Sequence, residues 1–161
     1  MKTTEIKKVL IGLDYDPTAE KVAEEGYSIA KAMGAEVTLL HVISDPINYT
    51  SPGHVTIMGF AGYMGTDALQ TDTVDALKKA SLSFLELSKK HLGDKTIQTL
   101  VEEGDCADTI LKIAKSTHTD IIVLGSHSHK WLENIVMGSV TEKVLHHTSI
   151  PLFIIPTKKH N

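Results

Sequence analysis

Short runs of consecutive apolar residues constrain the fold of this chain more than any other feature of its sequence. The run IIVL at 121–124 contains no polar residue in alternation, which is typical of a strand buried on both faces. Residues 9–13 (VLIGL) form a second such run. Three further strands are predicted at 36–43, 96–102 and 150–155, and between the strands the apolar residues recur at helical spacing. Strands that alternate with helices predict an α/β fold with a parallel sheet.

The length of 161 residues suits a single domain, 1–161, with a sizeable core. One helix is predicted from Pro17, with Asp16 as its cap, and another from about Asp72 to His91. Residues 44–71 differ from the rest, because they hold two prolines and four glycines among isolated apolar residues. They are predicted to form a long irregular insertion, not a second domain.

The segment after strand 121–124 has the character of an anion site. The strand ends at Gly125, a polar loop follows, and a helix is predicted to begin near Gly138. The first turn of a helix offers backbone N–H groups that lack intrahelical partners, and glycines allow close approach or a positive φ. Ser139 with Glu142 also fits a capping box, a role that one serine can combine with binding. The candidate phosphate-binding residues are Gly125, Ser126, His127, Ser128, Gly138, Ser139, Val140 and Thr141.

The residue pattern of this segment resembles the nucleotide-binding motif of the universal stress protein (UspA) family. Gly125, two residues, Ser128, nine residues and Gly138-Ser139 match that motif except at Ser128, where the ATP-binding branch carries glycine. The resemblance covers nearly all of the chain outside 44–72. It implies a single doubly wound five-stranded parallel sheet of order 3-2-1-4-5 with helices on both faces. It also implies bound ATP, with Asp14, the neighbouring Leu13 and the backbone of Val42 at the adenine end.

Other nucleotide motifs are absent from the sequence. The turn after the first strand lacks G-x-G-x-x-G, and G-x-x-x-x-G-K-[ST] occurs nowhere. The histidine pairs 127/129 and 146/147 are separated by a helix and have no carboxylate or thiolate at ligand spacing, so no protein-bound metal is expected. Mg²⁺ held mainly by the nucleotide's phosphates is the favoured metal hypothesis. No catalytic set of residues is apparent.

The composition of the chain limits which partners and which cellular compartment are expected for the protein. The net charge of −4 argues against a nucleic-acid-binding surface. The single cysteine, Cys106, is expected to be a small buried residue, and it fits a reducing compartment. No apolar run approaches the roughly 20 residues that span a bilayer, and the first residues lead directly into a strand. The expectation is a cytoplasmic protein without membrane or nucleic-acid partners.

The last strand is expected to form the interface of a homodimer. Its residues Pro151, Leu152, Phe153, Ile154 and Ile155 would lie at an edge of the sheet, and an open apolar edge invites pairing. The family commonly pairs this strand across a two-fold axis.

Three functions remain open at this point. The favoured hypothesis is a nucleotide-binding regulatory protein of stress responses. The alternatives are a dimeric interaction protein of the same family that binds no nucleotide, which Ser128 favours, and a slow ATPase, for which only His127, His129 and Lys130 are available as acid or base.

Overall fold

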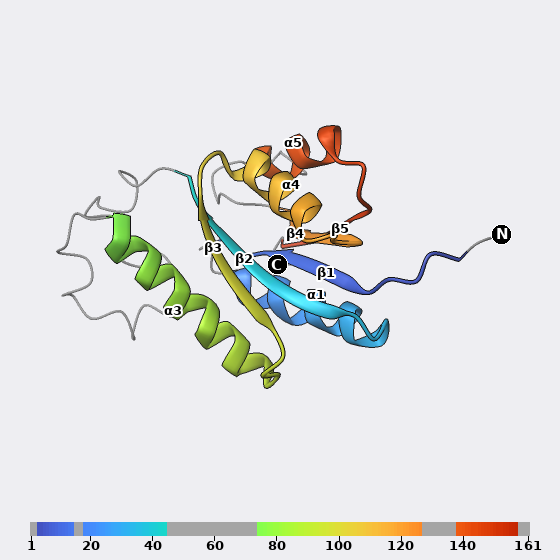
Figure 1. Ribbon diagram of the computed structural model, residues 1–161, viewed down its shortest axis with the longest axis horizontal. Coiled ribbons are helices and arrows are strands. Elements are labelled where there is room, and N and C mark those ends of the chain that lie inside the picture. Colours follow the sequence, from blue (N-terminus) through green and yellow to red (C-terminus); the bar gives the residue numbers. More distant parts are fainter. Residues whose placement is uncertain (1–2, 15–17, 45–73, 127–137, 158–161) are drawn as a thin grey trace.

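A computed structural model describes residues 3–14, 18–44, 74–126 and 138–157. Its centre is a five-stranded parallel sheet of order β3-β2-β1-β4-β5, which confirms the predicted architecture and strand order (Figure 1). The strands are β1 (Lys8–Gly12), β2 (Glu36–Ile43), β3 (Gln98–Glu103), β4 (Ile121–Gly125) and β5 (Leu152–Ile155). The helices are α1 (Ala19–Ala32), α3 (Val74–Leu92), α4 (Cys106–Ser116) and α5 (Ser139–His147).

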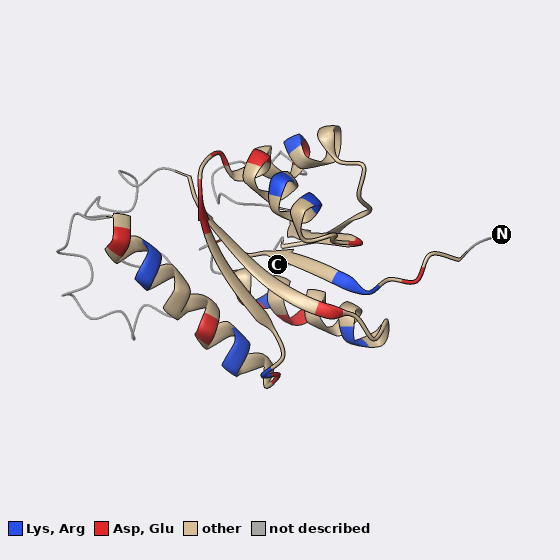
Figure 2. Cartoon of the chain, in the orientation of Figure 1, with Lys and Arg blue, Asp and Glu red and all other residues tan. Residues whose placement is uncertain are grey.

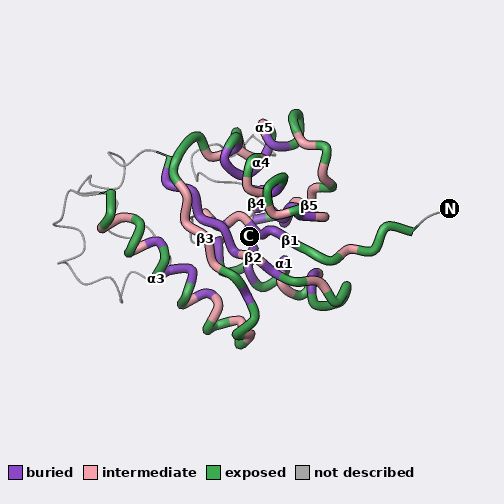
Figure 3. The backbone as a smooth tube through the Cα atoms, in the orientation of Figure 1, coloured by how far each residue is buried: buried purple, intermediate pink, exposed green. Residues whose placement is uncertain are grey.

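The helices cover both faces of the sheet (Figure 1), α1 and α3 on one and α4 and α5 on the other. Successive residues of a strand point to opposite faces, so each central strand feeds two cores. In β1, Ile11 packs among the residues of α1 and α3, whereas Leu10 packs with those of α4 and α5. This arrangement explains why the central strands are apolar without alternation, and Figure 3 shows the burial concentrated in them.

The strand order gives the sheet one topological switch point, between β1 and β4. On one side of it the chain adds β2 and β3, and on the other side β4 and β5. β1 lies between β2 and β4, with Ile11 opposite Leu39 on one side and Val123 on the other. The crossover from β1 leads to β2, while β4 and β5 extend the sheet in the opposite direction. Ligands of open α/β sheets bind at the carboxyl ends of the strands beside such a switch point. Asp14 and Gly125 follow β1 and end β4 at that edge.

The start of α1 and the capping of α5 differ from the sequence-based prediction, whereas α5 begins next to Gly138 as predicted. α1 begins at Ala19 with Thr18 as its N-cap, and that cap makes no side-chain hydrogen bond; Asp16 and Pro17 lie outside the described residues. The N-cap of α5 is Gly138, so Ser139 is already the first helical residue. The capping box predicted for Ser139 and Glu142 is therefore wrong, because the serine of a capping box is the N-cap residue and Ser139 is the residue after the N-cap.

Other predictions on the chain's organisation stay open. The insertion predicted at 44–71 lies outside the described residues except for Ser44, as do His127 and Ser128. None of the helices in the described ranges is long and apolar enough to cross a membrane. Lysines and acidic residues are interspersed along the exposed sides of the helices (Figure 2).

Candidate functional site

A pocket opens at the carboxyl edge of the sheet, beside the switch point. Its floor is made by the ends of β1, β2 and β4, and its walls by the first turns of α1, α4 and α5. Most of the lining is apolar, and Asp14, Thr18 and Thr141 contribute polar atoms. The lining residues are Gly12, Leu13, Asp14, Thr18, Ala19, Val22, Leu40, His41, Val42, Cys106, Ile110, Leu124, Gly125, Val140 and Thr141.

The turn that carries Asp14 is fixed to β2 by two hydrogen bonds. The Leu13 N–H donates to the carbonyl oxygen of Leu40 at 2.8 Å. The Leu13 carbonyl lies 2.8 Å from Nδ1 of His41, which must be the donor because a carbonyl oxygen can only accept. His41 is 1% exposed, and burial lowers the pKa of its imidazole below 6.5 against the opposing effect of that hydrogen bond. A neutral imidazole therefore holds the backbone just before Asp14.

The end of β4 and the start of α5 are joined directly. The Thr141 hydroxyl donates to the Gly125 carbonyl at 2.8 Å, and the Gly138 N–H donates to the Ser126 carbonyl at 2.6 Å. The Gly138 N–H is thus not available to an anion, which corrects the expectation from the sequence. The first intrahelical bond of α5 runs from the Glu142 N–H to the Gly138 carbonyl at 3.0 Å. The N–H groups of residues 139–141 precede that bond, and they belong to the donors that a helix leaves without intrahelical acceptors.

Gly125 is required for close packing and not for its backbone angles. Positive φ occurs, among the described glycines, at 34, 93 and 104, and Gly138 has φ −66°. A Cβ placed on Gly125 would lie 2.9 Å from Cγ2 of Val22 and 3.1 Å from Cγ2 of Thr157. The absence of a side chain at this position lets α1 approach the end of β4, and the pocket forms where these two elements meet.

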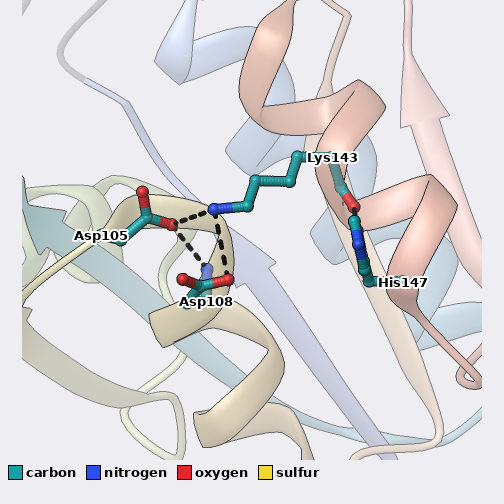
Figure 4. A network of polar contacts seen from close by, with 4 residues as sticks. All are labelled: Asp105, Asp108, Lys143 and His147. Atoms are coloured by element: carbon teal, nitrogen blue, oxygen red, sulfur yellow. Dashed lines mark hydrogen bonds and ion pairs between the residues drawn. The ribbon is translucent and has the colours of Figure 1, made fainter.

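An exposed polar network connects α5 to the start of α4 (Figure 4). Lys143 Nζ lies 3.0 Å from Oδ1 of Asp105 and 3.3 Å from Oδ1 of Asp108. Asp105 is also the N-cap of α4 and accepts the Asp108 N–H at 3.0 Å. These contacts lower the pKa of Asp105 and raise that of Lys143. Exposed ion pairs contribute little stability, so the network adds a minor electrostatic contact to the packing of α5 against α4.

Cys106, the first residue of α4, lies on the pocket wall. Burial raises the pKa of its thiol to about 12, and the negative charges of Asp14 and Asp105 add to the shift. A thiol with this pKa stays protonated at neutral pH and is a poor nucleophile. Cys106 is half-buried rather than buried as expected, but it packs against the core beside α4 and α5, and its protonated thiol gives the pocket no thiolate.

The structure brings together part of the set of site residues predicted from the sequence. Leu13, Asp14, Val42, Gly125, Val140 and Thr141 all line the pocket. Gly138 and Ser139 lie beside it at the start of α5, without lining it.

Ser126 is buried, and the structure does not place it on the pocket wall. Its hydroxyl accepts the Thr157 N–H at 3.0 Å. Thr18 and His41 also line the pocket but were not among the residues predicted from the sequence. His41 could have been found there, because it is the only ionisable residue inside the otherwise mostly apolar stretch 37–43.

Comparison with known proteins gives one consistent result. Residues 5–156 match the model of the universal stress protein family. Universal stress protein MJ0577 of Methanocaldococcus jannaschii is 28% identical over 155 residues, which are 94% of this chain and 96% of that protein. YxiE of Bacillus subtilis is 28% identical over 151 residues, 92% of this chain and 97% of that protein.

Solved structures show the same fold. The MJ0577 structure superposes with a TM-score of 0.69 over 98% of this chain and all of that one. The structure of a universal stress protein in complex with cAMP superposes with a TM-score of 0.65 at 16% identity. The match covers 96% of this chain and all of that one. The structure of the universal stress protein from Archaeoglobus fulgidus in complex with dAMP superposes with a TM-score of 0.57 at 16% identity. That match covers 94% of this chain and 99% of the other. At 16% identity, the last two likenesses concern the fold alone.

Proposed function

The chain belongs to the universal stress protein family, and on that premise we propose that it is a regulatory protein that binds an adenine nucleotide, ATP, in the pocket beside the switch point. The observation that carries this proposal is the convergence of Asp14, Val42, Gly125 and Thr141 on one pocket from four separate elements. The cAMP and dAMP complexes of family members support an adenine nucleotide as the ligand class.

The pocket has suitable chemistry at both of its ends. Val42, Ile110 and Leu124 offer an apolar surface to a purine ring, and the half-buried Asp14 supplies a carboxylate that can accept hydrogen bonds from ribose hydroxyls or the base. The phosphates would lie at the start of α5, where the N–H groups of residues 139–141 and the helix dipole favour negative charge.

Among the described residues, backbone N–H groups would carry most of the phosphate binding. The chain contains no arginine, and no lysine is found among the lining residues that the structure describes. Bidentate guanidinium contacts are therefore excluded, and Mg²⁺ bound to the phosphates would offset charge that the protein leaves unneutralised. The lack of an arginine also disfavours rapid phosphoryl transfer, which in many nucleotide hydrolases depends on such a residue.

Nucleotide binding is tested by equilibrium dialysis of ATP against two variants of one helix. Val140→Trp fills the pocket from the first turn of α5, whereas Leu145→Trp adds the same side chain to a position of that helix that is 45% exposed. We expect Val140→Trp to weaken ATP binding at least about tenfold, a loss of about 1.4 kcal/mol, and Leu145→Trp to leave it unchanged. Equal binding by the two variants would place the nucleotide elsewhere.

A dimeric interaction protein that binds no nucleotide is the second candidate, because Ser128 departs from the motif of the ATP-binding branch. No binding at millimolar ATP by the wild type and by Ser128→Gly alike would decide for this function. The slow ATPase remains the third candidate. Release of phosphate from bound ATP in a single turnover would support it, and recovery of intact ATP after denaturation of the protein would contradict it.

A further inference from the structure

Three side chains of the kinds that bind metals meet on the outside of the molecule, where α1 and α3 pack together. Nε2 of His91 lies 2.7 Å from Oε1 of Glu24 and 3.2 Å from Oε1 of Glu20. One ligand atom from each residue can be chosen so that all three lie within 4.8 Å of one another. All three residues are exposed, and none of them lines the nucleotide pocket.

The convergence follows from the packing of the two helices. Glu20 and Glu24 are four residues apart and share one face of α1. His91 is the penultimate residue of α3, which lies on the same side of the sheet as α1 (Figure 1). Beyond the end of α3, Tyr27 donates to Asp94 at 2.9 Å, which ties the helices together a turn away. The geometry of the cluster is therefore held by contacts outside it.

The cluster carries an excess of negative charge. In the ranges that the structure describes, the recorded ion pairs of Glu20 and Glu24 are both with His91. The side chain of Lys21, the residue after Glu20, is engaged elsewhere. Its Nζ lies 3.8 Å from Oε1 of Glu25 and donates to the Pro156 carbonyl oxygen at 2.7 Å. Two carboxylates thus face one imidazole, an arrangement that favours a bound cation. The same carboxylates raise the pKa of His91.

We propose that Glu20, Glu24 and His91 form a binding site for a divalent transition-metal ion, of which Zn²⁺ is the best fit. The ion would be held by Nε2 of His91 and one oxygen of each carboxylate, with water in the remaining position, and it would displace any proton on Nε2. An imidazole with two carboxylates suits zinc, whereas Mg²⁺ and Ca²⁺ take oxygen ligands.

The distances from Nε2 of His91 to the two carboxylate oxygens are near the separation that this ion requires. Zinc–ligand bonds of about 2.0–2.1 Å in a tetrahedral site place neighbouring ligand atoms roughly 3.3 Å apart. Nε2 of His91 lies 3.2 Å from Oε1 of Glu20, and its distance of 2.7 Å from Oε1 of Glu24 needs to increase by about 0.6 Å to reach that separation. Rotation of exposed glutamate side chains supplies that change without backbone movement.

A bound ion would cross-link α1 to α3. It binds the folded arrangement alone, because 67 residues separate Glu24 from His91 in the chain. It would therefore raise the melting temperature in proportion to the logarithm of the free ion concentration once the site is saturated.

The site is tested with Zn²⁺ alone, added to chelator-treated protein and followed by isothermal titration calorimetry. His91→Gln keeps a side chain able to bond Glu24 but removes the imidazole ligand. His147→Gln is the matched control, because His147 is also an exposed histidine near a helix C-terminus, with Nδ1 2.8 Å from the Lys143 carbonyl. We expect His91→Gln to weaken one equivalent of zinc at least about tenfold and to abolish the rise in melting temperature. His147→Gln should change neither.

A second pair of variants keeps the test independent of His91. Glu20→Gln and Glu24→Gln should each weaken the same equivalent of zinc, while Glu25→Gln, on the next position of α1, should not. Circular dichroism checks that each variant is folded. Zinc binding that is identical in the wild type and in folded His91→Gln, or absent from the wild type, would overturn the proposal.

Discussion

His41 donates its Nδ1–H to the carbonyl oxygen of Leu13, 28 residues earlier in the chain, at 2.8 Å. This bond joins the interior of β2 to the turn after β1, and the turn leads directly to Asp14 on the pocket wall. The ring of His41 meets Phe84 of α3 edge-on, with the centroids 6.2 Å apart. One buried imidazole thus connects the packing of α3 to the position of the candidate site.

The first prediction concerns the pH dependence of folding. Burial lowers the pKa of His41 below its ordinary value of 6.5, so the unfolded chain takes up the proton first as the pH falls. The free energy of unfolding should therefore decrease on acidification from pH 7.5 to 5.5. Urea titrations of His41→Asn, which retains an N–H donor but does not titrate, should show a smaller decrease. The raised pKa of His91 acts in the opposite direction and is common to both proteins.

If His41→Asn and the wild type lose the same free energy of unfolding between these two pH values, His41 does not control this pH dependence. The absolute stability of the variant is not the test, because the smaller side chain also leaves space in the core.

The second prediction concerns the contact between Gly125 and Val22. Gly125→Ala places a methyl group 2.9 Å from a methyl of Val22, and overpacking of this kind costs about 1–3 kcal/mol of folding free energy. The double variant with Val22→Ala should lose less than the sum of the two single variants. A double-mutant cycle by urea unfolding measures the coupling, and strict additivity would show that α1 does not depend on the glycine for its approach.

The third prediction concerns Ser128, which lies outside the described residues. If the position needs a positive φ to bind ATP, the serine reduces the binding free energy by about 1–2 kcal/mol. If the loop relaxes instead, binding loses one charge-assisted hydrogen bond, which contributes roughly 1.5–3 kcal/mol. Ser128→Gly should then tighten ATP binding by about 5- to 150-fold. Equilibrium dialysis measures the change. An unchanged or weaker affinity would mean that the serine hydroxyl donates to a phosphate and compensates fully.

The fourth prediction concerns the dimer, which we propose forms through β5. This strand is at the edge of the sheet, and Phe153 is 39% exposed there. Phe153→Asp places a charge in that edge and should yield a monomer in light scattering. Leu82→Asp is the control, since Leu82 is 44% exposed on α3, far along the chain from β5. A folded Phe153→Asp protein with the wild-type mass would move the interface to another surface.

Local patterns in the sequence predicted the strands and their parallel arrangement, which the structure confirms, and they pointed to the region of the candidate site. Local periodicity carries this information: 121–124 is apolar throughout because both faces of β4 are covered, and the helices show their apolar spacing for the same reason. The resemblance to the family rests on the spacing of Gly125, Ser128, Gly138 and Ser139, and the strand order is what that resemblance implies. The family match and the fold confirm both.

Contacts between residues far apart in the chain could be seen only in the folded structure. Nothing in the local pattern links His91 to Glu20 and Glu24, or His41 to Leu13, because their distances depend on how helices and strands pack. The same holds for Gly125, whose role depends on the approach of Val22 and not on its own backbone angles. Periodicity shows which face of an element is buried, but only packing determines what that face meets.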